Sequence, residues 1–148
     1  MKTVMLRRFV IPAMFLAGMA LCAGPALAAK SSAELSGANQ VPAVDTQGKG
    51  TADFTYDPDS KKLTWTISYS GLSGPVTAAH IHAGAAGANG KVLLPLTKQG
   101  GDNASPIKGS ATLTDDQAKA IMSGDTYVNV HTADHKGGEI RGQLPPPA

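Results

Sequence analysis

The stretch Thr51-Ala52-Asp53-Phe54-Thr55-Tyr56, followed by Leu63-Thr64-Trp65-Thr66-Ile67-Ser68-Tyr69, decides the fold. In both segments apolar side chains alternate with polar ones, which is the pattern of a β-strand with one face in a core. The Asp57-Pro58-Asp59-Ser60 segment between them is typical of a turn. The two segments therefore predict an antiparallel hairpin.

The same alternation, broken by Gly, Pro, Asn and Asp, recurs along the rest of the chain. Further strands are predicted at residues 33–35, 76–82, 92–96, 107–113, 127–132 and 139–144. Short strands at this spacing favour a sandwich or a barrel. We expect an all-β, Greek-key-like β-sandwich or barrel of 7–8 antiparallel strands, ending in a disordered Pro-rich tail at residues 145–148.

One short helix is expected near residues 114–123. Thr114 can cap the first amides while Gln117 reaches back to it, and aspartates in the first turn favour the positive end of the helix dipole. Gly124 is placed to end the helix. The stripe expected to face the core consists of Ala118, Ile121 and Met122.

The first 28 residues have the pattern of a secretory signal peptide. Positive residues precede an apolar run from Phe9 to Leu21, and Ala26-Leu27-Ala28 supplies the small residues of a cleavage site. The run is shorter than the roughly 20 residues that a membrane span needs. We expect cleavage after Ala28 and a periplasmic or secreted protein that does not remain in the membrane, although an uncleaved anchor stays open.

Removal of the signal peptide changes the composition. Three of the 13 Lys and Arg residues lie in it, which leaves 10 cations against 11 acids and a net charge of −1. No basic patch interleaved with aromatic residues remains, so nucleic acid is not an expected partner. The single cysteine, Cys22, also lies in the signal peptide, and the remaining chain has the length of one domain.

The four histidines form two clusters, His80-Ile81-His82 and His131 with His135. Side chains two residues apart on a strand share a face and lie about 6.5 Å apart, so His80 and His82 can reach one metal ion. His131 lies on the face opposite the valines of its strand, which adds a third imidazole. His135 falls in a predicted turn and is either a solvent-exposed turn residue or a fourth ligand.

The last two strands pair in a register that polar and apolar matching fixes. With the turn centred on His135, His131 lies opposite Glu139 and Asn129 lies opposite Arg141. Glu139 could then accept the second ring N–H of a histidine, as outer carboxylates do at metal sites. A cross-strand salt bridge between Glu139 and a neighbouring cation is the alternative.

Three neutral imidazoles without a cysteine indicate a nitrogen-ligand site rather than a blue-copper centre. The general affinity order of divalent metals favours Cu²⁺, and zinc remains an alternative. Nucleophile and phosphate-loop motifs are absent from the sequence. The glycine-rich residues 84–91 are expected to form a mobile strand connection with a tight turn at Asn89-Gly90.

Several segments together resemble the CHRD domain, a family named from chordin. The resemblance lies in residues 77–84 with Ala79-His80-Ile81-His82, residues 127–132 with Tyr-Val-Asn-Val-His-Thr, and residues 137–144 with Gly-Glu-Ile-Arg-Gly-Gln. It extends to residues 35–42 and to the helix start at Leu113, and covers about residues 31–144. The resemblance implies a secreted single-domain protein of bacterial type; chordin itself is an extracellular antagonist of growth factors.

A looser similarity links the chain to copper-zinc superoxide dismutase, in which an H-x-H strand and a later strand hold copper outside a β-sandwich. This similarity implies that His80, His82 and His131 match three copper ligands. The bridging histidine and the zinc-site residues have no counterpart. Three functions are therefore considered: a copper-binding protein, a structural or interaction module that contacts an extracytoplasmic protein through loops 83–91 and 97–106, and a dismutase-like redox enzyme.

Overall fold

The structure is a computed structural model that describes Gly24 and residues 26–148. The predicted signal peptide lies almost wholly outside the described residues. The first strand, β1, begins at Ala29, the residue that follows the expected cleavage point. In the described part of the chain, no helix has both the length and the apolar character needed to cross a membrane.

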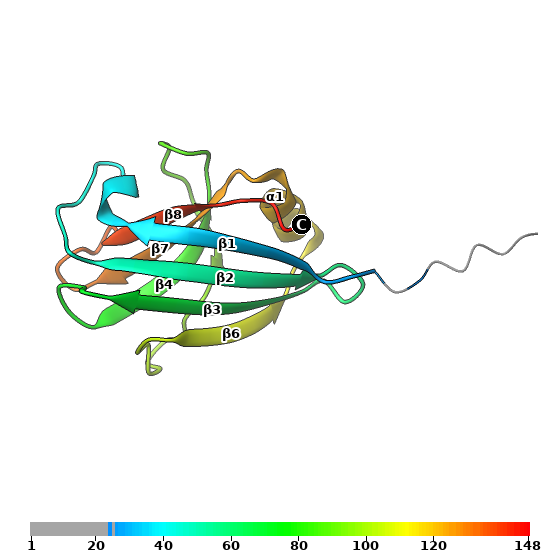
Figure 1. Cartoon of the computed structure of the whole chain (residues 1–148), viewed down its shortest axis with the longest axis horizontal. Helices are drawn as coiled ribbons and strands as arrows, with labels where there is room; N and C mark the ends of the chain where they lie inside the picture. The colour runs from blue at the N-terminus through cyan, green and yellow to red at the C-terminus, as the bar shows by residue number, and fades with distance from the viewer. Residues whose placement is uncertain (1–23, 25) are drawn as a thin grey trace, which may run out of the picture.

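Eight strands and one α-helix make up the fold, as the alternating pattern predicted (Figure 1). A one-turn 3-10 helix, η1, was not predicted. In chain order the elements are β1 (Ala29–Ser36), η1 (Gly37–Asn39), β2 (Lys49–Asp57), β3 (Lys62–Ser70), β4 (Val76–Ala83), β5 (Val92–Pro95), β6 (Ile107–Thr112), α1 (Asp115–Ser123), β7 (Thr126–Thr132) and β8 (Ile140–Leu144).

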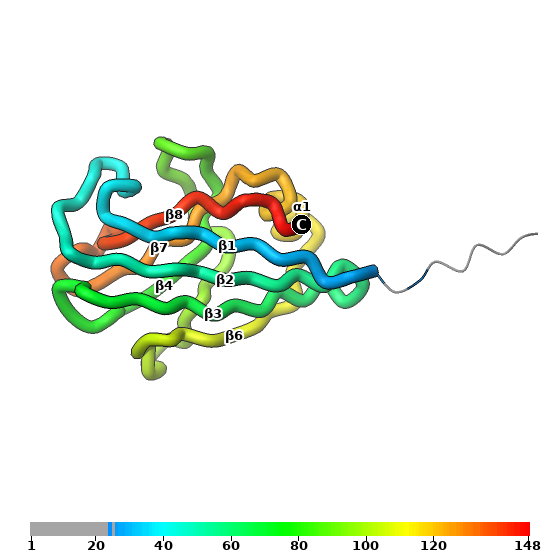
Figure 2. The backbone as a smooth tube through the Cα atoms, in the orientation of Figure 1, coloured from blue at the N-terminus to red at the C-terminus, as the bar shows by residue number. Residues whose placement is uncertain are grey.

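All strand pairs are antiparallel, in a single sheet of order β5-β4-β7-β8-β1-β2-β3-β6. The links from β3 to β4, from β5 to β6 and from β6 to β7 all cross between the two halves of this order, which gives the predicted Greek-key character. β1 and β8 pair at one position only, Ser36 with Arg141. The sheet curls at this junction, so that β1, β2, β3 and β6 form one wall and β4 and β7 lie behind them (Figures 1 and 2).

The core fills the inside of the curled sheet with the apolar half of each alternating strand. Phe54 and Ile67 come from one wall, Ile81 and Val128 from the other, and all four are at most 2 % exposed. The indole N–H of Trp65 donates to the Leu96 carbonyl at 3.1 Å and so connects β3 to the segment after β5. The outer face of β4 and β7 is thereby left for polar side chains.

The helix has the predicted start and end. The Thr114 hydroxyl accepts from the Gln117 amide, the Gln117 side chain accepts from the Thr114 amide, and Gly124 is left-handed with φ 80°. Ile121 packs in the core with 1 % exposure. The prediction that Met122 does the same is wrong, because its side chain is 45 % exposed. A helix of nine residues presents only a narrow stripe to the sheet, and Met122 lies beyond its edge.

The Pro-rich tail at residues 145–148 differs from the expected disordered end. Ala148 and Lys30 exchange two backbone hydrogen bonds, of 2.9 and 3.0 Å. The Ser31 hydroxyl donates to the Pro145 carbonyl. Extended prolines suit this arrangement because they occupy the edge of β1 without requiring amide partners of their own.

Candidate metal centre

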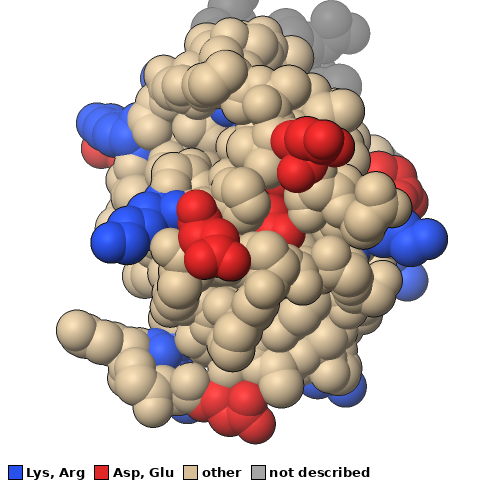
Figure 3. Space-filling model, turned by 90° about the vertical axis from the view of Figure 1, so that its left-hand side faces the viewer, with Lys and Arg blue, Asp and Glu red and all other residues tan. Residues whose placement is uncertain are grey.

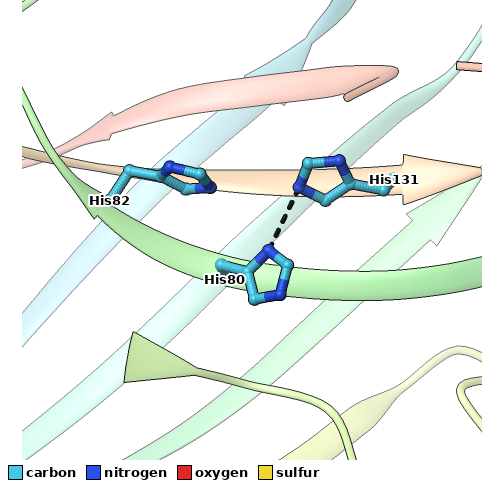
Figure 4. A group of neighbouring side chains, drawn as sticks. All are labelled: His80, His82 and His131. Carbon is cyan, nitrogen blue, oxygen red and sulfur yellow. Dashed lines mark hydrogen bonds between the residues drawn. The ribbon is translucent and has the colours of Figure 1, made fainter. Parts of the chain in front are cut away.

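Three histidines from two adjacent strands meet on the outer face of the sheet (Figure 4). His80 and His82 lie on β4, and His131 lies on β7, where it pairs with Ala78 and sits diagonally from His80. Between them Ile81 and Val130 point inward and are fully buried. Strand alternation therefore turns all three imidazoles outward, and each is partly buried.

The ring nitrogens are close enough to share an ion. One nitrogen from each histidine lies within 4.8 Å of the others. His80 Nδ1 and His131 Nε2 are 3.2 Å apart. Two nitrogen ligands at 2.0–2.1 Å from one ion would have this separation at an angle of about 100°. Because such ligands can be at most about 4.2 Å apart, small side-chain rotations suffice to close the cluster.

Backbone carbonyls set the orientation of two of the rings. His82 Nδ1 donates to the Gly90 carbonyl at 2.9 Å, and His131 Nδ1 donates to the Lys136 carbonyl at 2.8 Å. In the neutral rings these bonds place the proton on Nδ1 and leave the Nε2 lone pair free. His80 Nδ1 then donates to His131 Nε2, and for metal binding His80 must carry its proton on Nε2 instead.

The residues present fit a metal ion. His82 Nε2 is buried and has no hydrogen-bond partner among the residues that the structure describes. A buried nitrogen lone pair without a donor is costly, and a metal ion satisfies it. His82 Nε2, His131 Nε2 and His80 Nδ1 are the atoms that would hold the ion.

The electrostatics of the cluster favour the neutral forms of His80 and His131. Burial lowers the pKa of His80, and the neighbouring His131 and His82 lower it further. Burial also lowers the pKa of His131, against the hydrogen bond to the Lys136 carbonyl, which raises it. Neutral imidazole is the form that binds metals, so the cluster is ready to bind at neutral pH.

The comparison with known families agrees with the sequence motifs. The family model of the CHRD domain matches residues 31–144. The chain belongs to the CHRD domain family. The match runs from β1 to the last residue of β8 and includes all three clustered histidines. No curated protein and no solved structure matches the chain.

Neither His135 nor Glu139 belongs to the three-histidine cluster of this CHRD domain. His135 lies in the turn between β7 and β8 and is not part of the three-histidine cluster. The turn is centred where the sequence predicted, since Val130 pairs with Ile140 and Asn129 with Arg141. The predicted bond from a histidine to Glu139 is absent from the described residues, because the Lys136 carbonyl takes the His131 N–H instead.

Glu139 is fully buried and organises three loops. Its carboxylate accepts from the Thr46 hydroxyl at 2.6 Å, from the Ser73 amide and hydroxyl at 2.9 and 2.8 Å, and from the Thr132 hydroxyl at 2.7 Å. Burial alone would raise its pKa, but these hydrogen bonds outweigh burial and lower the pKa to about 2. The alternative salt bridge is also wrong, since neutral donors surround the carboxylate.

The outer face of β7 and β8 is covered rather than solvated. This outer face carries the side chains that the sequence placed there, yet each of them is at most 3 % exposed: Tyr127, Asn129 and Arg141. Residues 84–91 cover one part of this face, and Gln40 donates to the Asn129 side chain at 2.7 Å. The histidine cluster thus lies beside a buried polar layer, which alternation alone could not reveal because loops remote in sequence provide the cover.

The 84–91 loop also differs from its predicted conformation. The turn lies at Ala86-Gly87, where the Ala88 amide donates to the Ala85 carbonyl at 3.0 Å, and not at Asn89-Gly90. Gly90 is needed for another reason, because a Cβ there would overlap the Ala83 carbonyl oxygen. The close approach allows the Gly90 carbonyl to reach His82.

Charged side chains of both signs are interspersed at the end of the molecule that carries the β7–β8 turn (Figure 3). Large uncharged areas separate them in this view. The one salt bridge within the described residues joins Lys61 to Asp115, at the start of α1. It is exposed and lies outside the histidine cluster, so it has no part in the candidate site.

Proposed function

We propose that this CHRD-domain protein binds a single copper ion through His80, His82 and His131, in the periplasm or outside the cell. The observation that carries the proposal is the buried, unpartnered Nε2 of His82 beside two further ring nitrogens. An ordinary surface histidine has its polar atoms in water. Here a ring nitrogen is withdrawn from water and directed into a cluster of metal-ligating groups.

Copper is preferred to zinc on chemical grounds. Imidazole nitrogen suits both metals, and Cu²⁺ has the highest affinity of the common divalent ions for such a site. Three imidazoles with no thiolate would give a type-2-like copper centre. The extracytoplasmic location is supported by the signal-like pattern of residues 1–28, in which Ala26-Leu27-Ala28 forms the cleavage site.

Titration of the purified protein from Ala29 onward with Cu²⁺, followed by calorimetry and electron paramagnetic resonance, tests the proposal. We expect one ion per chain and a nitrogen-rich axial spectrum. The matched control is a variant in which His80, His82 and His131 are all alanine. Equal copper affinity in that variant would refute the site. Zn²⁺ titrated in parallel tests the metal, and superoxide consumption above that of free copper would support the redox alternative.

A second function, contact with an extracytoplasmic protein, is favoured by one feature of the fold. A cleft of about 520 Å³ lies between the unpaired edges of β5 and β6. Free strand edges can accept an extended peptide as an additional strand. The loop at residues 97–106 borders this cleft. Failure of the protein to bind copper or zinc, with the fold intact, would favour this second function.

A further inference from the structure

Tyr127 stands between a candidate metal ligand and a buried cation. Its ring stacks on His82 with 5.0 Å between centroids and an interplanar angle of 10°. The Arg141 guanidinium carbon lies 3.4 Å from the centroid of the same ring. Because β7 lies between β4 and β8, His82 and Arg141 approach the tyrosine from opposite sides. The three side chains form one continuous stack.

The same tyrosine also contacts the residue that orients His82. The Gly90 amide donates to the Tyr127 hydroxyl at 3.1 Å, and the Gly90 carbonyl accepts from His82 Nδ1 at 2.9 Å. Together with the stacking of the Tyr127 ring on the His82 ring, these two hydrogen bonds connect His82, Gly90 and Tyr127 to one another in a closed set of contacts. One side chain therefore holds both the plane of the imidazole and the carbonyl that determines its tautomer.

Arg141 secures the loop from the other side of Tyr127. Its Nη1 donates to the Asn89 side chain at 2.9 Å and its Nη2 to the Ala88 carbonyl at 2.6 Å. The Asn89 amide in turn donates to the Val41 carbonyl at 2.8 Å. Within residues 26–148 no carboxylate is within salt-bridge distance of Arg141, although its side chain is only 2 % exposed. The tyrosine ring and neutral oxygens stabilise the charge instead.

We propose that Tyr127 is a positioning residue for His82: it fixes the ring plane and the Nδ1–H tautomer, so that Nε2 is presented to the ion. This inference rests on the proposed metal-binding function and identifies a residue outside the ligand set that controls it. A tyrosine that only filled space would not need to stack in parallel on the imidazole. It would also not need a hydroxyl bonded to Gly90, the residue whose carbonyl accepts from His82. Outer residues that orient a ligand typically alter metal affinity 10- to 100-fold.

Tyr127→Phe isolates the hydroxyl, because the stack remains and only the acceptor of the Gly90 amide is lost. We expect copper affinity to fall about 10-fold. Tyr127→Leu removes the stack as well, and we expect a loss nearer to 100-fold. The matched control is Tyr69→Phe, which also deletes a hydroxyl that holds a loop, through the Asn103 carbonyl at 2.6 Å, but on β3, which does not pair with the strands that carry the histidines. That variant should bind copper like the parent.

Ring ¹⁵N chemical shifts of His82 in the metal-free protein, recorded where histidine is neutral, separate positioning from general stability. The parent should show the Nδ1–H tautomer, Tyr127→Phe a mixture, and Tyr69→Phe the parental pattern. An unchanged tautomer with unchanged affinity in Tyr127→Phe would overturn the inference. If Tyr127→Phe does not fold, Asn89→Ala, at an exposed loop position, replaces it and should give the same shift toward a mixture.

The two proposals fail in distinguishable ways. If the parent protein binds no metal while Tyr127→Phe still changes the His82 tautomer, the proposed function is wrong and the positioning role stands. If the parent binds copper and Tyr127→Phe changes neither tautomer nor affinity, the function stands and the positioning role is wrong.

Discussion

His80 Nδ1 lies 3.2 Å from His131 Nε2, across two adjacent strands, and each ring has a lowered pKa. The two nitrogens share one proton in the metal-free protein, because the other nitrogen of His131 is already bonded to the Lys136 carbonyl. A metal ion can take the place of that proton. The contact that joins His80 to His131 is therefore the same contact that would bring two ligands to an ion.

Loss of His131 should abolish tight copper binding, whereas loss of His135 should not. His131→Ala removes one of three ligands, so we expect the affinity for Cu²⁺ to fall by more than about 100-fold, beyond what outer residues cause. His135→Ala is the control, since His135 lies outside the cluster. Calorimetric titration measures both. Similar affinities in the two variants would mean that the ion does not bind at His131.

His80 and His131 should resist protonation. Burial and the neighbouring rings lower the pKa values of His80 and His131 below the ordinary 6.5. As the pH falls, the unfolded chain then takes up protons before the folded protein does. The contribution of these two histidines to the free energy of unfolding should therefore be fully present above about pH 6.5 and should be lost as the pH falls through the folded-state pKa values. NMR titration of the ring protons should give midpoints below 6.5; midpoints above it would contradict the geometry.

Glu139 should contribute to stability through its lowered pKa. Because the folded pKa is about 2 and the ordinary value is 4.5, its contribution is present above pH 4.5 and is lost as the pH falls toward 2. The shift corresponds to about 3 kcal/mol. Urea unfolding of Glu139→Gln at neutral pH should show a loss of about this size, and its stability should depend less on pH below 4.5.

Glu34→Gln is the matched control for that substitution, because Glu34 is exposed on β1. It should leave the free energy of unfolding within about 0.5 kcal/mol of the parent. If Glu139→Gln behaved like Glu34→Gln, the hydrogen bonds that join the three loops to Glu139 would not be contributing to stability.

Removal of residues 145–148 should destabilise the domain, contrary to what a disordered tail would do. The deletion removes the two backbone hydrogen bonds between Ala148 and Lys30 and the bond from Ser31 to the Pro145 carbonyl. At typical net values of about 0.5 to 1.5 kcal/mol per bond, these three bonds amount to roughly 1.5 to 4.5 kcal/mol. Thermal unfolding of the shortened protein measures the effect, and an unchanged midpoint would show that the tail is not held in solution.

Most of the fold could be predicted from local patterns in the sequence. Alternation placed Ile81 and Val130 inside and the histidines outside, and matching of polar with polar residues gave the β7–β8 register. The Thr114 and Gln117 pair marked the helix start because capping depends only on neighbours in the chain. These features are decided within a few residues, so a single sequence is sufficient to predict them.

The surroundings of the site were not predictable in the same way. Glu139 is buried because Thr46 and Ser73, more than 60 residues away, fold over it. The 84–91 loop is held by Arg141 on another strand. The alternation of side chains along a strand places each side chain on one face of the sheet, but it does not show whether a loop covers that face. The tyrosine beside His82 was visible as a residue of the same face, and its stack became evident only in three dimensions.

A crystal structure of the copper-soaked protein, with anomalous scattering at the copper edge, tests most directly whether His80, His82 and His131 hold one metal ion. We predict a single strong peak at about 2.0 Å from His82 Nε2, His131 Nε2 and His80 Nδ1. A strong peak at other residues, or none at this cluster under saturating copper, would contradict the account.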